Sequence, residues 1–282
     1  MTTNLLKGLL NIQSYGDNDL NKIVMVKDDP TPIVNKRGNP LDFFVRDALC
    51  NSFTIKNPKT KMDIYLKEFS HFGDQNNPPD IMIKGDDALE VKKVEKFGGG
   101  SIALNSSYPK NKLHKSDSML TEKCRMSERW DEKDIIYCIG HVFRNKLKIL
   151  IFIYGDCYAA KPSFYKKIRE SIILGLGKLK LNLSKTKELA RLNKFDPLGI
   201  TDLRVRGMFQ IKSPIKLFSD FIIPDLEKHL SVFAIMKKSK FDQFNREDKE
   251  NIQNSMNLSD IRIKNPDNPE ELMDAKLIDF SI

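Results

Sequence analysis

The fold is decided by one stretch, residues 77–93, which reads NPPDIMIKGDDALEVKK. Two runs of residues with β-strand character flank the cluster Gly85-Asp86-Asp87, whose residue types favour a tight turn. The pattern therefore predicts a β-hairpin with a loop of three residues. In that register Asp80 faces Lys92 across the hairpin, and Met82 faces Glu90.

The alternation of side chains gives this hairpin one polar and one apolar side. Asp80, Glu90 and Lys92 share the polar side, because successive side chains of a strand point to opposite faces. The other side carries four apolar residues suited to a core: Ile81, Ile83, Leu89 and Val91. A loop of two residues would move Asp80 onto the apolar side, so the hydrophobic pattern selects the longer loop.

Two carboxylates and an amine on one patch are suited to binding a metal ion and a water. Asp80 and Glu90 offer hard anionic oxygens suited to a divalent cation such as Mg²⁺. Lys92 is placed to hold a water beside the cation, and the cation can polarise a phosphoryl oxygen. The alternative is an exposed hairpin with a cross-strand Asp–Lys pair, which contributes little to stability. The hairpin alone leaves both interpretations open.

Composition indicates a globular protein with a polyanionic partner. The 282 residues are 40% hydrophobic and 30% charged, as in folded domains. Lys and Arg number 47 against 38 Asp and Glu, which gives a formal charge of +9 and a pI near 9.2. That balance favours nucleic acid, whose phosphates release counterions when they are neutralised. A basic surface that serves only solubility is the alternative.

The cysteines and the apolar runs exclude several other classes. No Cys-x-x-Cys pair occurs among the four cysteines, which argues against a structural zinc site or a disulfide framework and for reduced thiols in a cytoplasmic protein. The first ten residues lack the pattern of a signal peptide. The longest apolar run, 149–154, is too short to span a bilayer, so no membrane association is expected.

The remaining pattern predicts helices around a sheet, an α/β (α+β) fold. Strands are expected at 63–69, 135–142, 147–154 and 203–211, the third of them central because it is almost continuously apolar. Helices are expected near the start of the chain, from Pro40, from Pro162, over 184–193 and within 214–230. We expect one catalytic and DNA-binding domain over 1–236 and a polar C-terminal extension over 237–282 with no core of its own.

Three groups of polar side chains outside the hairpin are further site candidates. Asp42, on the helix that begins at Pro40, is expected to point toward the polar side of the hairpin, although helix solubility explains it equally well. Arg204 and Arg206 share one face of a strand and suit phosphates or guanine edges, with surface ion pairs as the alternative. The polar stretch 101–115 offers hydrogen-bond donors for DNA, with an ordinary solvated loop as the alternative. Its candidate DNA contacts are Asn105, Ser106, Ser107, Tyr108, Lys110 and Lys112.

A helix followed by strands that carry Pro79-Asp80 and Glu90-Val91-Lys92 resembles the PD-(D/E)xK nuclease superfamily. Longer segments are similar to the NgoPII-type type II restriction endonucleases, and the similarity extends over about residues 38–220. The segments that carry it are 77–80, 89–93, 103–110, 130–137 and 196–208. The resemblance implies a mixed central β-sheet flanked by helices, the restriction-endonuclease-like core.

The same resemblance implies an activity and a set of roles. It implies Mg²⁺-dependent hydrolysis of both strands of double-stranded DNA at a short, GC-rich, GGCC-like palindrome, leaving 5′-phosphates. Asp80, Glu90 and the Val91 carbonyl would ligate one or two Mg²⁺, and Lys92 would position the attacking water. Asp42 stands where many relatives carry the longer Glu, so its part in the metal site stays open. A palindrome implies a two-fold homodimer and, as genetic partner, a protecting DNA methyltransferase.

Two other functions remain as alternatives. A repair nuclease of the same superfamily would share the hairpin but would cut damaged or branched DNA. A non-catalytic DNA-binding protein would need only the basic surface, and the intact set Asp80, Glu90 and Lys92 argues against it. A zinc-dependent His/Cys nuclease is excluded by the spacing of these residues.

Overall fold

The structure is a computed structural model of the chain. It describes the residues 3–23, 40–74, 77–95, 100–104, 108–144, 146–178, 188–194 and 196–282.

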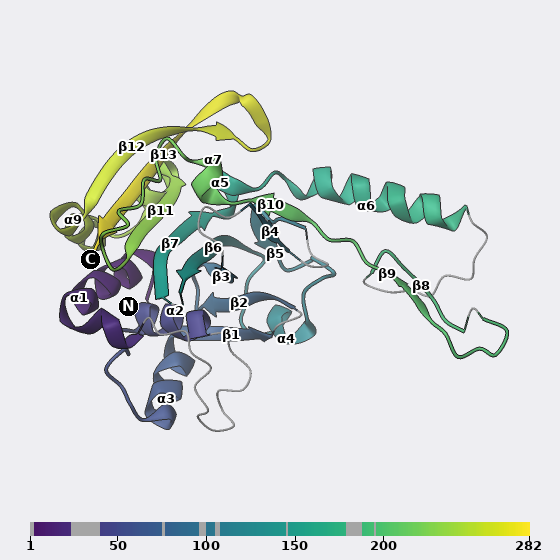
Figure 1. The fold of residues 1–282 in the computed structure, drawn as a ribbon, viewed down its shortest axis with the longest axis horizontal. Helices are drawn as coiled ribbons and strands as arrows, with labels where there is room; N and C mark the ends of the chain where they lie inside the picture. The colour runs from purple at the N-terminus through teal and green to yellow at the C-terminus, as the bar shows by residue number, and fades with distance from the viewer. Residues whose placement is uncertain are drawn as a thin grey trace.

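A large mixed β-sheet forms the centre of the molecule (Figure 1). Its strands pair in the order β1-β2-β3-β6-β7-β11-β13-β12, and β5 (Lys112–His114) pairs with β6 beside this path. The β3–β6 and β7–β11 pairs are parallel and the other pairs antiparallel. The bounds along the path are β1 Phe69–Asp74, β2 Asn77–Ile83, β3 Ala88–Val94, β6 Glu132–Phe143, β7 Lys146–Tyr154, β11 Ser231–Lys237, β13 Asn268–Ser281 and β12 Asn257–Asn265.

Helices flank this sheet, which confirms the expected fold class. Helix α1 packs against both α2 and α9 at the side of the molecule where the two termini lie (Figure 1). No helix in the described part of the chain is long and apolar enough to cross a membrane. The helices are α1 Leu5–Ile23, α2 Pro40–Cys50, α3 Pro58–Glu68, α4 Glu122–Arg125, α5 Gly155–Tyr158, α6 Pro162–Gly177, α7 Pro214–Leu217, α8 Lys238–Gln243 and α9 Arg246–Ser255.

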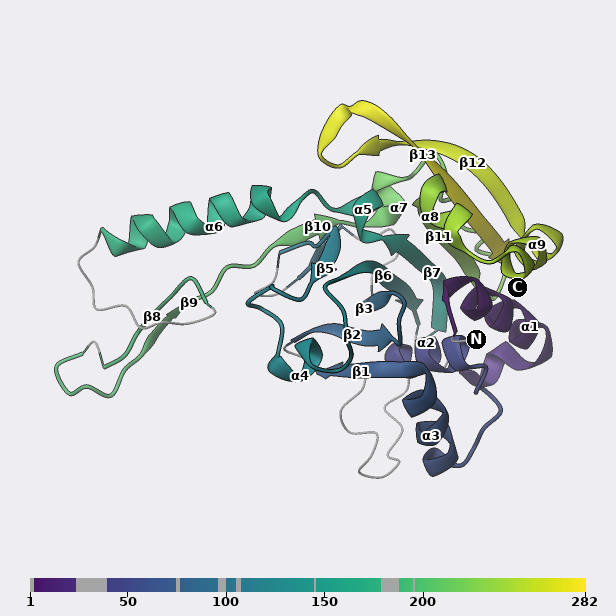
Figure 2. The ribbon, with the colours of Figure 1, turned by 180° about the vertical axis from the view of Figure 1, so that it is seen from behind.

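An arm projects from this body, as Figures 1 and 2 show from opposite sides. It consists of α6 and of a ribbon formed by β8 (Ala190–Leu192) and β9 (Leu203–Val205). A short sheet of β4 (Ser101–Ala103) and β10 (Gln210–Lys212) lies at its root. The ring of Tyr165 packs between Tyr108, at 5.6 Å, and Phe209, at 5.8 Å, and so fixes the root of α6.

The strand expected in the middle of the sheet is central. The residues Ile149 to Ile153 of β7 are fully buried, because helices or neighbouring chain cover both faces of the sheet. Strand β6 pairs with one edge of β7 and β11 with the other. A continuous apolar run in the sequence is what burial on both faces requires.

The hairpin register differs from the expected one by two residues. Met82 pairs with Ala88 instead of Glu90, and Ile81 pairs with Leu89. The connection is longer than three residues, and the Ile83 N–H donates to the Asp87 carbonyl at 2.9 Å. A shift by two residues keeps every side chain on its expected face, because side chains alternate with a period of two. The polar and apolar sides of the hairpin are therefore preserved.

Contacts from outside the hairpin explain the longer turn. Lys133, from β6, donates its ammonium to the carbonyl oxygens of Ile83, at 3.0 Å, and Asp86. Glu128 accepts the Gly85 N–H at 2.8 Å and pairs with Lys133 at 2.7 Å. Gly85 has a φ of +68°, a conformation that glycine adopts without strain.

Several expected elements were wrong. Residues 63–68 belong to α3, because Pro58 opens a helix and the Asn57 side chain accepts the N–H groups of Lys59 and Thr60 as its cap. Helix α1 is much longer than the expected short helix. Within 184–193, the residues 184–187 lie outside the described part of the chain and 190–192 form β8.

Two further elements are shorter than expected. The strand expected over 203–211 is interrupted, so that β9 pairs with β8 and β10 with β4. Within 214–230 only the four residues of α7 are helical. Beyond residue 237, the residues 275–281 of β13 pair with the whole of β11, and Ala275, Leu277 and Ile278 join the buried core. The expected division of the chain at residue 237 stays a prediction.

Candidate active site

Strands β2 and β3 bring Asp80, Glu90 and Lys92 together. The observed register, continued by one pair beyond Ile81 and Leu89, sets Asp80 opposite Glu90. The Asp80 Oδ2 atom accepts the backbone N–H of Val91 at 2.7 Å. The Lys92 Nζ atom lies 2.6 Å from Glu90 Oε1. The polar patch expected from the sequence is thus one cluster, in which Lys92 contacts Glu90 and Asp80 binds the backbone of the residue that follows Glu90.

Burial and like charge shape the protonation of this cluster. Burial, together with the neighbouring carboxylates of Glu90 and Asp42, raises the pKa of Asp80 to about 7, against the lowering effect of Lys92 and the Val91 N–H. Burial alone would lower the pKa of Lys92, but Glu90 and Asp80 outweigh it, so its pKa is raised. Lys92 therefore stays a charged ammonium beside the two carboxyl groups. A further cation would stabilise the ionised form of these carboxyl groups.

One carboxylate oxygen in this cluster has no hydrogen-bond donor. Glu90 Oε2 is buried and has no partner, whereas Oε1 binds Lys92. A buried acceptor without a donor is costly, and a hard cation satisfies it. Mg²⁺ needs only one or two protein carboxylates because it keeps several waters, so the pair Asp80 and Glu90 fits this ion. Within the described ranges, no group of three or more His, Cys, Asp or Glu side chains is arranged to hold a metal.

Asp42 approaches the cluster from α2. It lies in the first turn of the helix and is half-buried. Its charge raises the pKa values of Asp80, Lys92 and the nearby Cys138 thiol, which places it within electrostatic reach of the two carboxylates. The direction in which Asp42 points and its part as a metal ligand stay predictions.

Arg46 is a member of this site that sequence reasoning missed. It lies one helical turn after Asp42, is only 9% exposed, and its guanidinium carbon is 5.4 Å from the Phe43 ring and 5.0 Å from the Phe72 ring. Burial lowers its pKa, while the charges of Asp42 and Asp80, among others, raise it. The spacing of four residues from Asp42 was the available signal, because such residues share a helix face. The contact with Phe72 requires the fold.

A small hollow lies beside Glu90. It measures about 10 Å³, and its walls include Pro78, Glu90, Leu104 and Tyr137. That is roughly the space of a single water molecule. The Tyr137 hydroxyl accepts the Lys110 N–H at 2.7 Å and so closes one wall. The carboxylate of Glu90 therefore borders a space in which one water fits.

Comparison with known proteins identifies the family. The family model of the NgoPII restriction endonuclease matches residues 3–267. The type II restriction enzyme NgoPII of Neisseria gonorrhoeae is 43% identical over 252 residues, which are 88% of this chain and 90% of that enzyme. The chain belongs to the NgoPII restriction endonuclease family. It is accordingly an enzyme of the restriction endonuclease class. No solved structure matches it.

Two of the DNA-contact candidates in this restriction endonuclease are buried. Lys110 is 2% exposed, forms an ion pair with Asp117 and lies 4.3 Å from the centre of the Tyr108 ring. Tyr108 is also buried and stacks on Tyr165 of the arm. The candidates Asn105, Ser106 and Ser107 lie outside the described residues. Tyr108 and Lys110 therefore hold the chain that follows this loop against the root of the arm.

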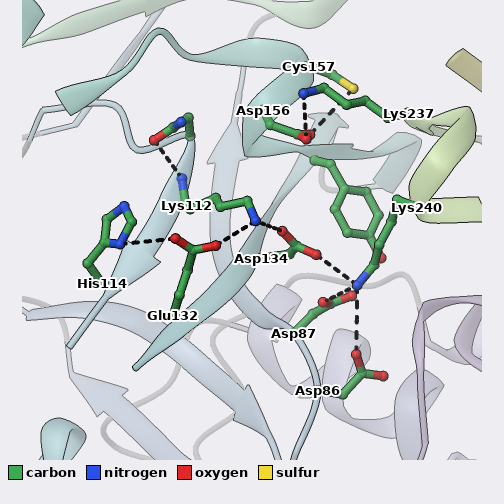
Figure 3. Close-up of polar contacts among 12 residues, drawn as sticks. Asp86, Asp87, Lys112, His114, Glu132, Asp134, Asp156, Cys157, Lys237 and Lys240 are labelled. Atoms are coloured by element: carbon green, nitrogen blue, oxygen red, sulfur yellow. Dashed lines mark hydrogen bonds and ion pairs between the residues drawn. The ribbon is translucent and has the colours of Figure 1, made fainter. Parts of the chain in front are cut away.

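Lys112 lies in a network of charged side chains (Figure 3). Its Nζ atom is 2.6 Å from Glu132 and 3.4 Å from Asp134, and these contacts raise its pKa. Asp134 in turn lies 2.9 Å from Lys240 of α8, which also pairs with Asp87 at 2.7 Å. Carboxylates around Lys240 raise its pKa. The network ties the turn of the β2–β3 hairpin to the C-terminal part of the chain.

Arg204 and Arg206 lie on the ribbon of the arm and bind the same carboxylate. The Glu188 Oε1 atom accepts from Arg204 and from Arg206, each at 2.6 Å. Both arginines are about half exposed, at 49% and 56% of their side chains. They share one side of the ribbon, as predicted, but lie on the projecting arm, away from the cluster around Glu90 (Figure 1).

Proposed function

We propose that this chain is a PD-(D/E)xK type II restriction endonuclease that depends on Mg²⁺. It hydrolyses both strands of double-stranded DNA at a short palindrome, of the GC-rich, GGCC-like kind, and leaves 5′-phosphates. The observation that carries the proposal is the pair Asp80 and Glu90 with an unsatisfied buried oxygen on Glu90 and the ammonium of Lys92 beside it. The sequence Pro79-Asp80 followed by Glu90-Val91-Lys92 supports the superfamily assignment.

Asp80 and Glu90 would hold the Mg²⁺, one or two ions per site, with the Val91 carbonyl and Asp42 as further candidate ligands. When bound, Mg²⁺ supplies polarisation of the scissile phosphate and acidification of a coordinated water. Lys92 is kept protonated by the two carboxylates and would position the attacking water. The Val91 N–H fixes the Asp80 carboxylate in place for this arrangement.

The DNA contacts in this proposal come from several parts of the chain. The net charge of +9 favours a phosphate backbone. Arg204 and Arg206 would exchange their shared Glu188 for phosphate or guanine, and Lys112 would contact the backbone. Tyr108 and Lys110 would serve by positioning the loop with Asn105, Ser106 and Ser107.

The biological setting follows from the same proposal. A palindrome presents two identical half-sites, which calls for two chains related by a two-fold axis. We therefore include a homodimer in the proposal. A DNA methyltransferase of the same specificity is the expected genetic partner, since host DNA must be protected. The site of action is the cytoplasm, where that DNA lies.

The test is incubation of the purified protein with unmethylated plasmid of known sequence, with Mg²⁺ or with EDTA, followed by sequencing of all fragment ends. We expect discrete Mg²⁺-dependent fragments that share one palindrome and carry 5′-phosphates. Glu90→Ala should lose at least about 1,000-fold in cleavage rate and still bind DNA, because it removes the open metal-facing oxygen.

Glu95→Ala is the matched control, since Glu95 follows the same strand but its side chain is 74% exposed and pairs with the neighbouring Lys93. It should cut like the unaltered protein. Cleavage confined to branched or mismatched substrates would replace the proposal with a repair nuclease. Full activity of Glu90→Ala would remove the cluster from the mechanism.

A further inference from the structure

Helix α6 exposes an apolar stripe. Phe164, Ile168 and Ile172 follow one another at intervals of four residues and are 54%, 56% and 43% exposed. No residue of this helix is buried. Residues four apart share a helix face, so the three side chains form one continuous ridge, here called the α6 stripe. A ridge of this kind on a soluble protein marks an interaction surface.

An apolar groove lies at the root of the same helix. It has a volume of about 590 Å³ and lies between α5, α7 and the tip of the β12–β13 hairpin (Figure 1). Its apolar lining includes Tyr158, Leu217, Phe218, Phe221, Ile263 and Leu272. Leu217 and Leu272 are each 47% exposed at its walls. This feature is called the hairpin groove below.

A chain is unable to fill its own hairpin groove with its own α6 stripe. Tyr165 and Ala160 line the groove, so α6 begins there and runs outward (Figures 1 and 2). The direction of α6 is fixed by the stacking of Tyr165 on Tyr108 and by a hydrogen bond of 2.8 Å from Arg169 to the Glu188 carbonyl. Folding back would break both contacts. The stripe and the groove of one chain therefore do not cover each other, and both are open to another molecule.

The charges around the two features complement each other. Lys166 and Lys167 are exposed on α6 beside the stripe. Asp220 lines the groove, and Glu270 and Glu271 are exposed on β13 beside it. The groove is also lined by the cations Arg262 and Lys264, and Arg262 pairs with Asp274 at 3.7 Å. The acidic margin repels DNA phosphates and attracts the basic helix, so the chemistry favours a protein that carries such a helix.

We infer that the occupant of the hairpin groove is the α6 stripe of a second copy of this chain. A two-fold axis exchanges identical surfaces, so a surface that holds both a ridge and a matching groove closes on itself with two equal contacts. The inference rests on the homodimer of the proposed function and names the surface that forms it. It places the arm of each chain across the root of its partner's arm.

Sedimentation equilibrium of the protein without DNA or Mg²⁺ tests this surface separately from cleavage. The unaltered chain should be a dimer at micromolar concentration. Ile168→Glu and Leu272→Glu should each weaken association by at least about 30-fold, a factor that corresponds to about 2 kcal/mol. Leu66→Glu is the matched control, because Leu66 is 52% exposed on another helix, and it should leave the dimer intact. Thermal melts should show all three variants folded.

A mixture of the two weakened variants gives the sharper result. In a mixed dimer, the altered stripe of the Ile168→Glu chain meets the altered groove of the Leu272→Glu chain. The other contact then joins an unaltered stripe to an unaltered groove. The mixture should therefore associate more strongly than either variant alone. Weakening by Ile168→Glu but not by Leu272→Glu would show pairing of α6 with α6 and overturn the inference. So would an unaltered chain that sediments as a monomer, which would leave DNA or another protein as the occupant.

A dimer that responds as expected but cuts no plasmid would retain this surface and reject the proposed function. A protein that cuts at a palindrome, but whose dimer is weakened by neither substitution, would support the proposed function and reject this surface.

Discussion

At the scale of single residues, Asp80 is held where its ionised form is disfavoured. Burial, with the nearby carboxylates of Glu90 and Asp42, raises its pKa to about 7 from an ordinary 3.8. The unfolded chain ionises this group near pH 4, while the folded chain keeps its proton until about pH 7. Stability without metal is therefore lost as the pH rises from about 4 to about 7, and it stays reduced above that.

Asp80→Asn should accordingly stabilise the metal-free protein at pH 8. The amide removes a buried negative charge beside Glu90 and still accepts the Val91 N–H. We expect a gain of roughly 1–3 kcal/mol, seen as a rise in melting temperature of roughly 3–8 °C. At pH 4 the gain should vanish, because Asp80 is then protonated in the folded chain. Scanning calorimetry at both pH values is the measurement.

Asp63→Asn, an exposed change on α3, is the control and should shift the melting temperature at neither pH. A gain that is equal at pH 4 and pH 8 would mean that the Asp80 charge is not its origin.

At the scale of elements, the sequence identified the helix of Asp42, the β2–β3 hairpin and strands β6 and β7, because each has a strong local pattern. It placed Asp80, Glu90 and Lys92 on one face for the same reason. It missed the register of the hairpin, since Lys133 and Glu128 extend the turn through contacts from distant parts of the chain. Arg46 was missed in the same way, because Phe72 reaches it only in the folded sheet.

The hairpin turn also depends on α8, which packs across it from the C-terminal part of the chain. Lys240 lies 2.7 Å from Asp87 and 2.9 Å from Asp134 (Figure 3). The Tyr154 hydroxyl donates to Asp87 at 2.6 Å. Asp87 is only 2% exposed. Removing the ammonium leaves a buried carboxylate without its cation.

Lys240→Met should therefore destabilise the protein by roughly 3–5 kcal/mol, or roughly 10 °C in melting temperature. The additional change Asp87→Asn should recover part of the loss, because it removes the unpaired charge and keeps an acceptor for Tyr154. Lys238→Met, on an exposed position of the same helix, is the control. A melting temperature that falls equally in Lys238→Met would assign the effect to the helix and not to the ion pairs.

At the scale of the whole molecule, each chain offers one cluster around Asp80 and Glu90, near one edge of the sheet, and one arm that leaves the body at α6 (Figure 1). In the proposed function, this cluster is the one that cuts a strand. If each chain cuts one strand, the proposed hydrolysis of two strands needs two chains. The number of intact subunits in a dimer should decide how many strands are cut.

A dimer with one unaltered chain and one Glu90→Ala chain should nick its site. The two chains are co-expressed with different tags, purified in succession and assayed at once on a supercoiled plasmid with a single target site. We expect open circles to accumulate, with linear product at least about 10-fold slower than from the unaltered dimer, because the altered subunit lacks the buried Glu90 oxygen proposed to bind the metal. A second purification on each tag after the assay checks for subunit exchange, because dimers that have not exchanged still carry both tags. Linear product at the unaltered rate from sorted dimers would mean that one chain cuts both strands in turn.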